Sequence, residues 1–531
     1  MKRRVLKTAF TVVFSAILAG CGGGGGEGNG VVSEDTASQA QETVLRESSL
    51  PQLDDAAFNA LKDGEKLYVA KKIYATLYKG KSPEDLRREI DSGRFLSRLK
   101  SRLHREGVAQ PDRQKVFVDD YEIPYDARAG DRLFEKRWRI FAQIASNLYY
   151  TRLGKAYYDA WIAYVLSQTI LFSPAYEVDS VKPFPELIYS GYSRLREALS
   201  ANLTIREVVY GHMVSKENWA RFRSPEDNGR EMLEIWLYDY EDAHVPLAAK
   251  ALKNWRWELR RERNGSGVYG DVYRFYNDTN NLEEINDEPV EILGRSVTTG
   301  EDFYRMVANH PKLLATVTDR LVNLFYPTFP AERKAWITQA ILSSEPRTFQ
   351  DIFDQILFSK AYLLESDRIR TIEEIFMPLA QQMGMHPDGT TFRYLMTRGM
   401  EPAAQAPFLY KLGRLDEGES NTDSVIRMHR YIRDAVFLNR SKDGIAVGEL
   451  MKRYESDGLE GYLNNMFLDV TGREMTEDEK ETLLEIVREA GIGVENAGHW
   501  DRFAVLLMVF DYFSRLSEIY TYRKIDGGGV S

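Results

Sequence analysis

The sequence has a single cysteine, Cys21, among 531 residues. Without a second thiol, disulfides within the chain are excluded, so a hydrophobic core must hold the fold together. After the first twenty residues the chain also lacks a long uncharged apolar run. The best stretch, residues 503–513, is short and contains Asp511. The body is therefore not expected to span a membrane.

An excess of positive charge is missing as well. The chain carries 70 Lys and Arg against 80 Asp and Glu, a net charge of -10, and the first seven residues hold four of the positive charges. A protein this acidic lacks the basic footprint that nucleic acid requires and gains no electrostatic attraction to anionic lipid. We therefore expect no nucleic-acid partner.

Two familiar catalytic patterns are absent. The seven histidines include no His-x-x-x-His pair, and the chain has no Gly-x-Ser-x-Gly. The first absence argues against a zinc site of a common type, and the second argues against a nucleophile elbow.

The start of the chain has the features of a bacterial lipoprotein leader. Four positive charges in residues 1–7 precede an apolar stretch over 8–18, which is too short to span a membrane. Leu18-Ala19-Gly20-Cys21 looks like a lipobox, in which small residues enter the peptidase and the thiol receives diacylglycerol. We expect a signal peptide over 1–20, export by the general secretory route and a membrane anchor through lipid on Cys21. Gly22, where Asp would favour retention at the inner membrane, predicts the outer membrane if the source is diderm.

The mature chain divides into three parts. Residues 21–53 begin with a glycine run and contain little to bury, which predicts a flexible tether with a coil span of about 30 Å. Residues 54–525 should form the body, and 526–531 a disordered tail.

Helical patterns dominate the body. Ser82-Pro83 and Ser224-Pro225, each followed by two acidic residues, are typical helix starts, and Thr476 with Glu479 forms a capping-box pattern. We expect an all-α fold, one large multi-helix domain, with two lobes as an alternative.

Residues 264–295 interrupt the helices with glycines, an Asn/Asp cluster at 277–281 and Pro289. We expect a long irregular loop, with short strands as an alternative. The Asn/Asp cluster offers oxygen ligands but lacks the calcium-loop glycine, which favours a polar turn.

Several segments, in order, resemble the bacterial domain-of-unknown-function family 1800. The most similar stretches are the helix containing Val165-Leu166-Ser167-Gln168, the helix Asp227-Asn228-Gly229-Arg230-Glu231, the helix over 240–255, and residues 292–294, 309–311, 358–384 and 469–520. The resemblance implies an exported protein but no reaction. The chain departs from the family pattern at His244, where Asp is usual, at Lys253-Asn254, and at residues 286–289, which lack the family's His, Gly and Lys.

Five residues are candidates for chemistry: Arg230, Glu231, Glu234, His244 and Asp287. Glu231 and Glu234 share a helix face, and carboxylates with a histidine are ligands for a hard or borderline metal. The structural alternative, which we favour, is a buried Arg–Glu network around Arg230 and Glu231 that bridges helices, with Glu234 on the solvated side.

Residues 255–263 combine Trp255 and Trp257 with four arginines. Aromatic side chains beside arginine stack on sugars or anionic polymers. The structural alternative is an amphipathic helix with its tryptophans inward.

Two functions follow from the sequence. The first is an envelope lipoprotein that binds a protein or polysaccharide partner through its helical body. The second is an envelope enzyme with a carboxylate-rich, metal-dependent site around Glu231. No cofactor is indicated by the sequence.

Overall fold

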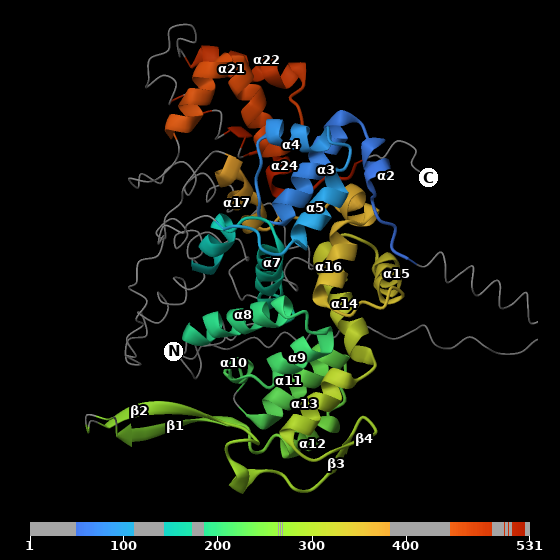
Figure 1. Cartoon of the computed structure of the whole chain (residues 1–531), viewed down its shortest axis with the longest axis vertical. Helices are drawn as coiled ribbons and strands as arrows, with labels where there is room; N and C mark the ends of the chain where they lie inside the picture. The colour runs from blue at the N-terminus through green and yellow to red at the C-terminus, as the bar shows by residue number, and fades with distance from the viewer. Residues whose placement is uncertain are drawn as a thin grey trace, which may run out of the picture. The chain divides into compact units, whose positions relative to one another are not determined.

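The computed structural model describes residues 49–110, 143–171, 185–222, 224–263, 269–382, 447–490 and 515–525, with a few single residues between them. The signal peptide, Cys21, most of the tether and the tail lie outside these residues. The described part is mostly helical and carries two small antiparallel sheets (Figure 1). The all-α prediction is thus correct for the greater part of the fold but not for all of it.

Helices make up most of the residues that the structure describes. Their bounds are α2 Asp55–Asn59, α3 Asp63–Thr76, α4 Pro83–Ile90, α5 Phe95–Leu103, α7 Lys155–Ser167, α8 Pro185–Ser200, α9 Ile205–Met213, α10 Lys216–Trp219, α11 Pro225–Leu237, α12 His244–Ala251, α13 Gly300–Asn309, α14 Lys312–Phe325, α15 Ala331–Leu342, α16 Phe349–Leu357, α17 Ile372–Gln382, α21 Val447–Thr471, α22 Glu477–Glu489 and α24 Ser517–Tyr520. A 3-10 turn, η2, covers Leu282–Glu284, and a π-helical turn, η3, covers Ala361–Glu365.

The expected helix starts are confirmed by their caps. The Ser82 hydroxyl accepts a hydrogen bond from the Asp85 N–H at 3.2 Å, and Ser224 does the same for Asp227. At α22, Thr476 and Glu479 form the reciprocal capping box. Each cap satisfies a backbone N–H that the first helical turn leaves without a partner.

Two of the strands lie within residues 264–295, where short strands were the alternative to an irregular loop. β1 (Arg256–Arg263) pairs antiparallel with β2 (Tyr269–Tyr276), so that Trp257 faces Phe275 and Arg263 faces Tyr269. A smaller pair, β3 (Val290–Ile292) and β4 (Arg295–Val297), follows. The alternative of an amphipathic helix over 255–263 is wrong, because charged and apolar residues alternate over 256–260 with the period of two that suits a strand.

The core is rich in aromatic rings. Trp161, Trp219, Trp236 and Trp255 are all 1% exposed and belong to one continuous cluster of buried side chains. The described residues from Ser49 onward belong to one compact unit. No helix in the described part of the chain is both long and apolar enough to cross a bilayer.

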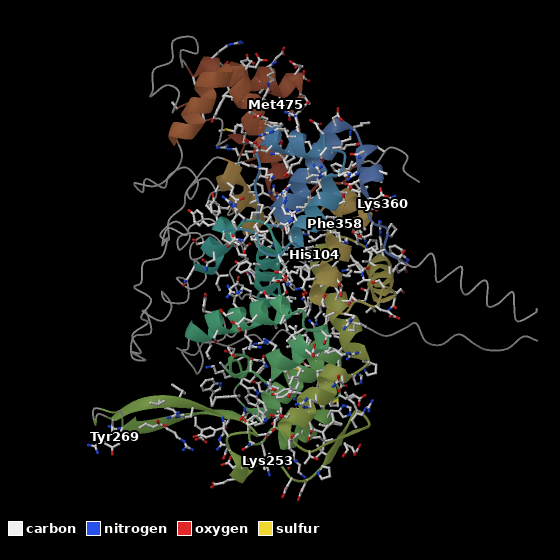
Figure 2. The ribbon with its side chains drawn as sticks, viewed as in Figure 1. His104, Lys253, Tyr269, Phe358, Lys360 and Met475 are labelled. Carbon is white, nitrogen blue, oxygen red and sulfur yellow. The ribbon has the colours of Figure 1, made fainter. Side chains whose placement is uncertain are left out.

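Packing begins earlier than the expected tether boundary. Leu50 and Leu53 are each 3% exposed. The Leu53 N–H donates to the Phe358 carbonyl at 2.8 Å, and the Lys360 N–H donates to the Pro51 carbonyl at 2.9 Å (both partner residues are labelled in Figure 2). Residues 50–53 are therefore part of the body.

Candidate functional site

The candidate helix α11 ends in a tight turn that returns the chain alongside it. Tyr238 has a φ of +50°, a left-handed conformation that stops the helix, and the Asp239 N–H donates to the Leu233 carbonyl at 3.2 Å. The next helix, α12, then lies against α11. Gly229 permits this close approach, because a Cβ there would lie 2.8 Å from the Ala248 Cβ.

The expected ion pair between Arg230 and Glu231 is wrong. Arg230 Nη1 donates to Asp242 Oδ1 at 2.8 Å across the turn, and its side chain is 41% exposed. Neighbouring residues on a helix do not face each other, whereas the returning loop brings Asp242 within reach. The structural alternative of a buried network therefore does not describe this helix.

The other predicted residues do not converge on Glu231. Glu231 and Glu234 are half-buried on α11, and burial raises the pKa of Glu234. Asp287 is exposed in the segment before β3. Among the described residues, the only predicted residue found in a group with metal-ligand spacing is His244.

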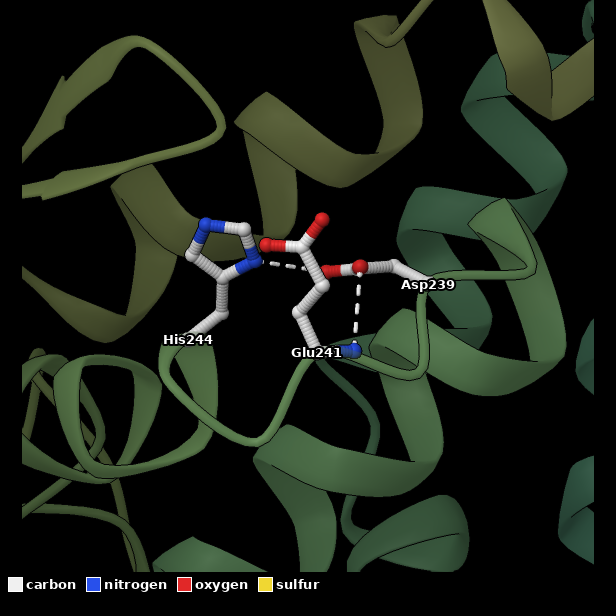
Figure 3. Close-up of side chains that lie close together, drawn as sticks. All are labelled: Asp239, Glu241 and His244. Carbon is white, nitrogen blue, oxygen red and sulfur yellow. Dashed lines mark hydrogen bonds and ion pairs between the residues drawn. The ribbon is translucent and has the colours of Figure 1, made fainter.

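His244 belongs to a cluster formed with Asp239 and Glu241, the Asp–Glu–His cluster. One ligand atom from each of the three side chains lies within 4.8 Å of the other two. His244 Nδ1 lies 2.8 Å from Asp239 Oδ2, and the Glu241 carboxylate points toward the space between them (Figure 3). Asp239 is 8% exposed, whereas Glu241 is exposed to solvent.

The Asp–Glu–His cluster has the donor atoms for a borderline divalent cation. An imidazole with two carboxylates suits Zn²⁺ and similar ions. Within the described residues, neither Asp239 nor Glu241 forms an ion pair with a lysine or arginine. A cation would therefore balance two carboxylates that lie close together.

Sequence reasoning found one residue of this cluster and missed two. Asp239 and Glu241 stand in an Asp-x-Glu-x-x-His stretch between two helices, and that spacing was the available signal. The helical periodicity around Glu231 does not indicate it, because Asp239 and Glu241 lie in the turn after that helix.

A second feature, the β1–β2 arm (residues 256–276), extends away from the helices (Figure 1), and Tyr269 lies at its far end (Figure 2). It is held at its root by aromatic packing. Trp255 stacks on Trp219 with 5.8 Å between ring centroids and meets Phe275 edge-on. Gly300 lies so close that a Cβ there would be 2.2 Å from Trp255 Nε1.

The two faces of the β1–β2 arm differ in character. Because directly paired residues share a face, Arg256, Glu258, Arg260 and Glu262 lie with Arg274 and Tyr276. On this paired face, Arg260 meets Glu258 at 2.9 Å and Arg274 meets Glu262 at 2.6 Å.

The opposite, open face carries Trp257, Leu259, Arg261 and Arg263 with Tyr269, Asp271, Tyr273 and Phe275. Leu259 is 54% exposed and Tyr269 60% exposed. The Arg261 guanidinium lies over the Tyr269 ring at 5.9 Å. Asp271 is the direct partner of Arg261 in the strand register, and Arg263 Nε donates to the Gly267 carbonyl at 3.0 Å. The open face thus combines exposed apolar surface with two arginines and one aspartate.

The Asn/Asp cluster at 277–281 anchors the β1–β2 arm. Asn254 Nδ2 donates to the Asn277 carbonyl at 2.8 Å, and Asp278 Oδ2 accepts from the Glu301 N–H at the start of α13 at 2.9 Å. Asp278 is 6% exposed. These contacts account for the cluster as a structural turn.

No protein-family model, no curated protein and no solved structure matches the chain. The resemblance to family 1800 therefore remains a prediction from sequence, and the function has to be argued from the geometry described above.

Proposed function

We propose that the protein is a lipid-anchored envelope lipoprotein that binds an acidic polysaccharide through the open face of the β1–β2 arm. The observation that carries this proposal is the presence of exposed Tyr269 and Leu259 beside Arg261 and Arg263 on one face of a projecting hairpin.

The charge of the arm supports an anionic partner. Residues 256–276 contain five arginines and three acidic residues, whereas the whole chain has a net charge of -10. An acidic polymer is thus attracted to the arm and repelled by most of the chain. Tyrosine rings stack on sugar faces, and guanidinium groups pair with carboxylates in a bidentate manner.

The test measures binding of the mature chain to alginate, a polyuronate. We expect the double variant Arg261→Gln with Arg263→Gln to bind about tenfold or more weakly than the parent. The affinity of the parent itself should fall as salt is added. The matched control is Arg260→Gln with Arg274→Gln, which removes the same charge from the paired face of the same hairpin. Equal losses for both double variants would show that net charge alone attracts the polymer, and the face-specific proposal would fail.

The membrane anchor is part of the same proposal and rests on the sequence around Cys21. Expression of the full chain with Cys21→Ser should leave the precursor unprocessed or release the protein from membranes. If this variant is processed and fractionates as the parent does, the anchor is not lipid on Cys21.

A second candidate function is a metal-dependent activity, favoured by the Asp–Glu–His cluster. We expect Zn²⁺ to bind the parent in calorimetry and to raise its melting temperature. His244→Gln and Glu241→Gln should remove this effect. Asp242→Asn is the control, because Asp242 is a neighbouring carboxylate outside the cluster. Zn²⁺ binding that survives in His244→Gln would exclude the cluster as the metal site.

A further inference from the structure

We propose that the exposed side of α5 docks on the anionic phospholipid headgroups of the membrane that holds the lipid anchor. The docking surface, the basic face of α5, consists of the exposed arginines Arg94, Arg98 and Arg105. This inference rests on the membrane anchor proposed above, but it concerns a surface separate from the β1–β2 arm and from the Asp–Glu–His cluster.

Positive charge is concentrated on α5 although the chain as a whole is acidic. Residues 92–105 contain five lysines and arginines and no acidic residue, whereas the whole chain carries a net charge of -10. That net charge argues against attraction of the whole protein to anionic lipid. Attraction at a membrane surface acts only within about a Debye length, however, so the local charge of the facing surface decides it.

The basic face lies opposite the buried side of the helix. Positions 94, 98 and 105 return to one side at helical spacing; Arg94 caps the start of α5, and Arg105 follows its last turn. The buried side is apolar and consists of Phe95, Leu96, Leu99 and Leu103. α5 therefore packs its apolar side into the core and presents its basic side to water.

The charges of the basic face are available to a partner. Arg94, Arg98 and Arg105 form no ion pair with any residue that the structure describes. Arg102, by contrast, meets Glu89 on α4 at 3.1 Å. A phosphate group that approaches the basic face therefore displaces no carboxylate, and guanidinium groups bind phosphate oxygens well.

The start of the body lies directly against α5. Asp55 Oδ1 at the start of α2 accepts a hydrogen bond from the Leu96 N–H of α5 at 2.8 Å. The Lys100 ammonium lies over the Phe358 ring at 5.5 Å from its centroid, and the Phe358 carbonyl accepts from the Leu53 N–H (Phe358 is labelled in Figure 2). The segment that leads to Cys21 therefore leaves the body beside this helix.

The length of that segment keeps the basic face near the membrane surface. Cys21 and Leu53 are 32 positions apart, and a chain of that length spans at most about 110 Å when fully extended. A surface tethered in this way meets its partner at a high effective concentration, so a weak contact is enough to orient the body. Position and charge together favour the headgroups of the anchoring membrane over a partner free in solution.

The test measures co-sedimentation of the mature chain, produced without its lipid, with vesicles at low salt. The vesicles contain phosphatidylcholine alone or an equal mixture of phosphatidylcholine and phosphatidylglycerol. We expect the parent to bind only the mixed vesicles and to be released by added salt. The triple variant Arg94→Gln, Arg98→Gln and Arg105→Gln should bind about a hundredfold more weakly, because each arginine near an anionic surface contributes a factor of about five.

Two further variants make the test specific. The matched control removes three exposed positive charges elsewhere on the body and should bind as the parent does: Lys253→Gln, Lys312→Gln and Arg488→Gln. Ser101→Glu keeps all three arginines of the basic face, adds a negative charge beside them and should also weaken binding. It guards against a triple variant that does not fold.

The proposal is overturned if the parent binds both kinds of vesicle alike, or if the α5 triple variant and its control lose binding equally. Because the protein in this test carries no lipid, failure of the Cys21 anchor would not change the result. The arm variant Arg261→Gln with Arg263→Gln should bind the mixed vesicles as the parent does, which separates this surface from the polysaccharide site. If the α5 triple variant loses alginate binding and keeps vesicle binding, the basic face binds the polysaccharide and the membrane proposal fails.

Discussion

The β1–β2 arm and the interior around α17 both contain arginine–glutamate pairs, but in opposite surroundings. On the arm, the side chains of Arg274 and Glu262 are 56% and 33% exposed. In the interior, those of Arg368 and Glu374 are 5% and 3% exposed. Water screens the first pair, so its charges exchange partners at little cost, whereas the second pair cannot lose one member without leaving a buried charge. The same type of ion pair is therefore dispensable for stability on the arm and required for it in the interior.

Breaking the interior pair should have the largest effect on stability. Arg368→Met leaves Glu374 buried without its cation, and we expect the free energy of unfolding to fall by about 3–5 kcal/mol. Chemical denaturation measures this loss. The double variant Arg368→Met with Glu374→Gln should lose less, because no unpaired charge remains. If the double variant loses as much as the single one, the cost comes from packing rather than from charge.

A buried histidine should make the stability of the interior depend on pH. His212 is 4% exposed, and burial, with Arg194 and Arg221 nearby, holds its pKa well below 6.5. Its neutral form contributes stability above the unfolded pKa of about 6.5, and this contribution is lost as the pH falls and the unfolded chain takes up the proton. We expect a loss of about 2 kcal/mol between pH 7 and pH 5, measured as the pH dependence of denaturation.

Two variants separate this effect from other titrations. His212→Gln should flatten the loss. His104, hydrogen-bonded to Asp354, has a raised pKa, so its contribution is complete at low pH and is lost as the pH rises. His104→Gln should therefore make the acid loss of stability steeper. Identical pH profiles for the parent and His212→Gln would contradict the assignment.

The smallest effect is expected at the exposed pairs. Arg274→Gln on the arm and Arg230→Ala on α11 each remove one member of a solvated ion pair. We expect the melting temperature of both variants to match that of the parent within error, because water replaces the lost partner. Thermal denaturation checks this directly. A sharp fall in the melting temperature of Arg230→Ala would contradict this prediction and would support a buried network around Arg230.

The helical part of the fold was predictable because caps are local. Ser82, Ser224 and Thr476 bond to backbone groups within their own first turn, so short stretches of sequence specify them. The β1–β2 arm was missed because Trp255 and Trp257 were interpreted as the inward face of a helix. The pairing with Phe275 and Tyr273 depends on a second strand that begins beyond the turn.

The Asp–Glu–His cluster was predictable only in part. The sequence indicated His244 as a candidate ligand. Asp239 and Glu241 come close to it because the left-handed residue Tyr238 ends α11 and turns the chain back.

The packing at the root of the β1–β2 arm has a mechanical consequence. A ribbon of two strands with no third strand bends and twists easily, whereas Trp255 is clamped between Trp219 and the backbone at Gly300. The arm is thus fixed to the body at its root and more flexible along the rest of its length. A force applied to its tip is therefore delivered to α13, which begins at Gly300 beside Trp255.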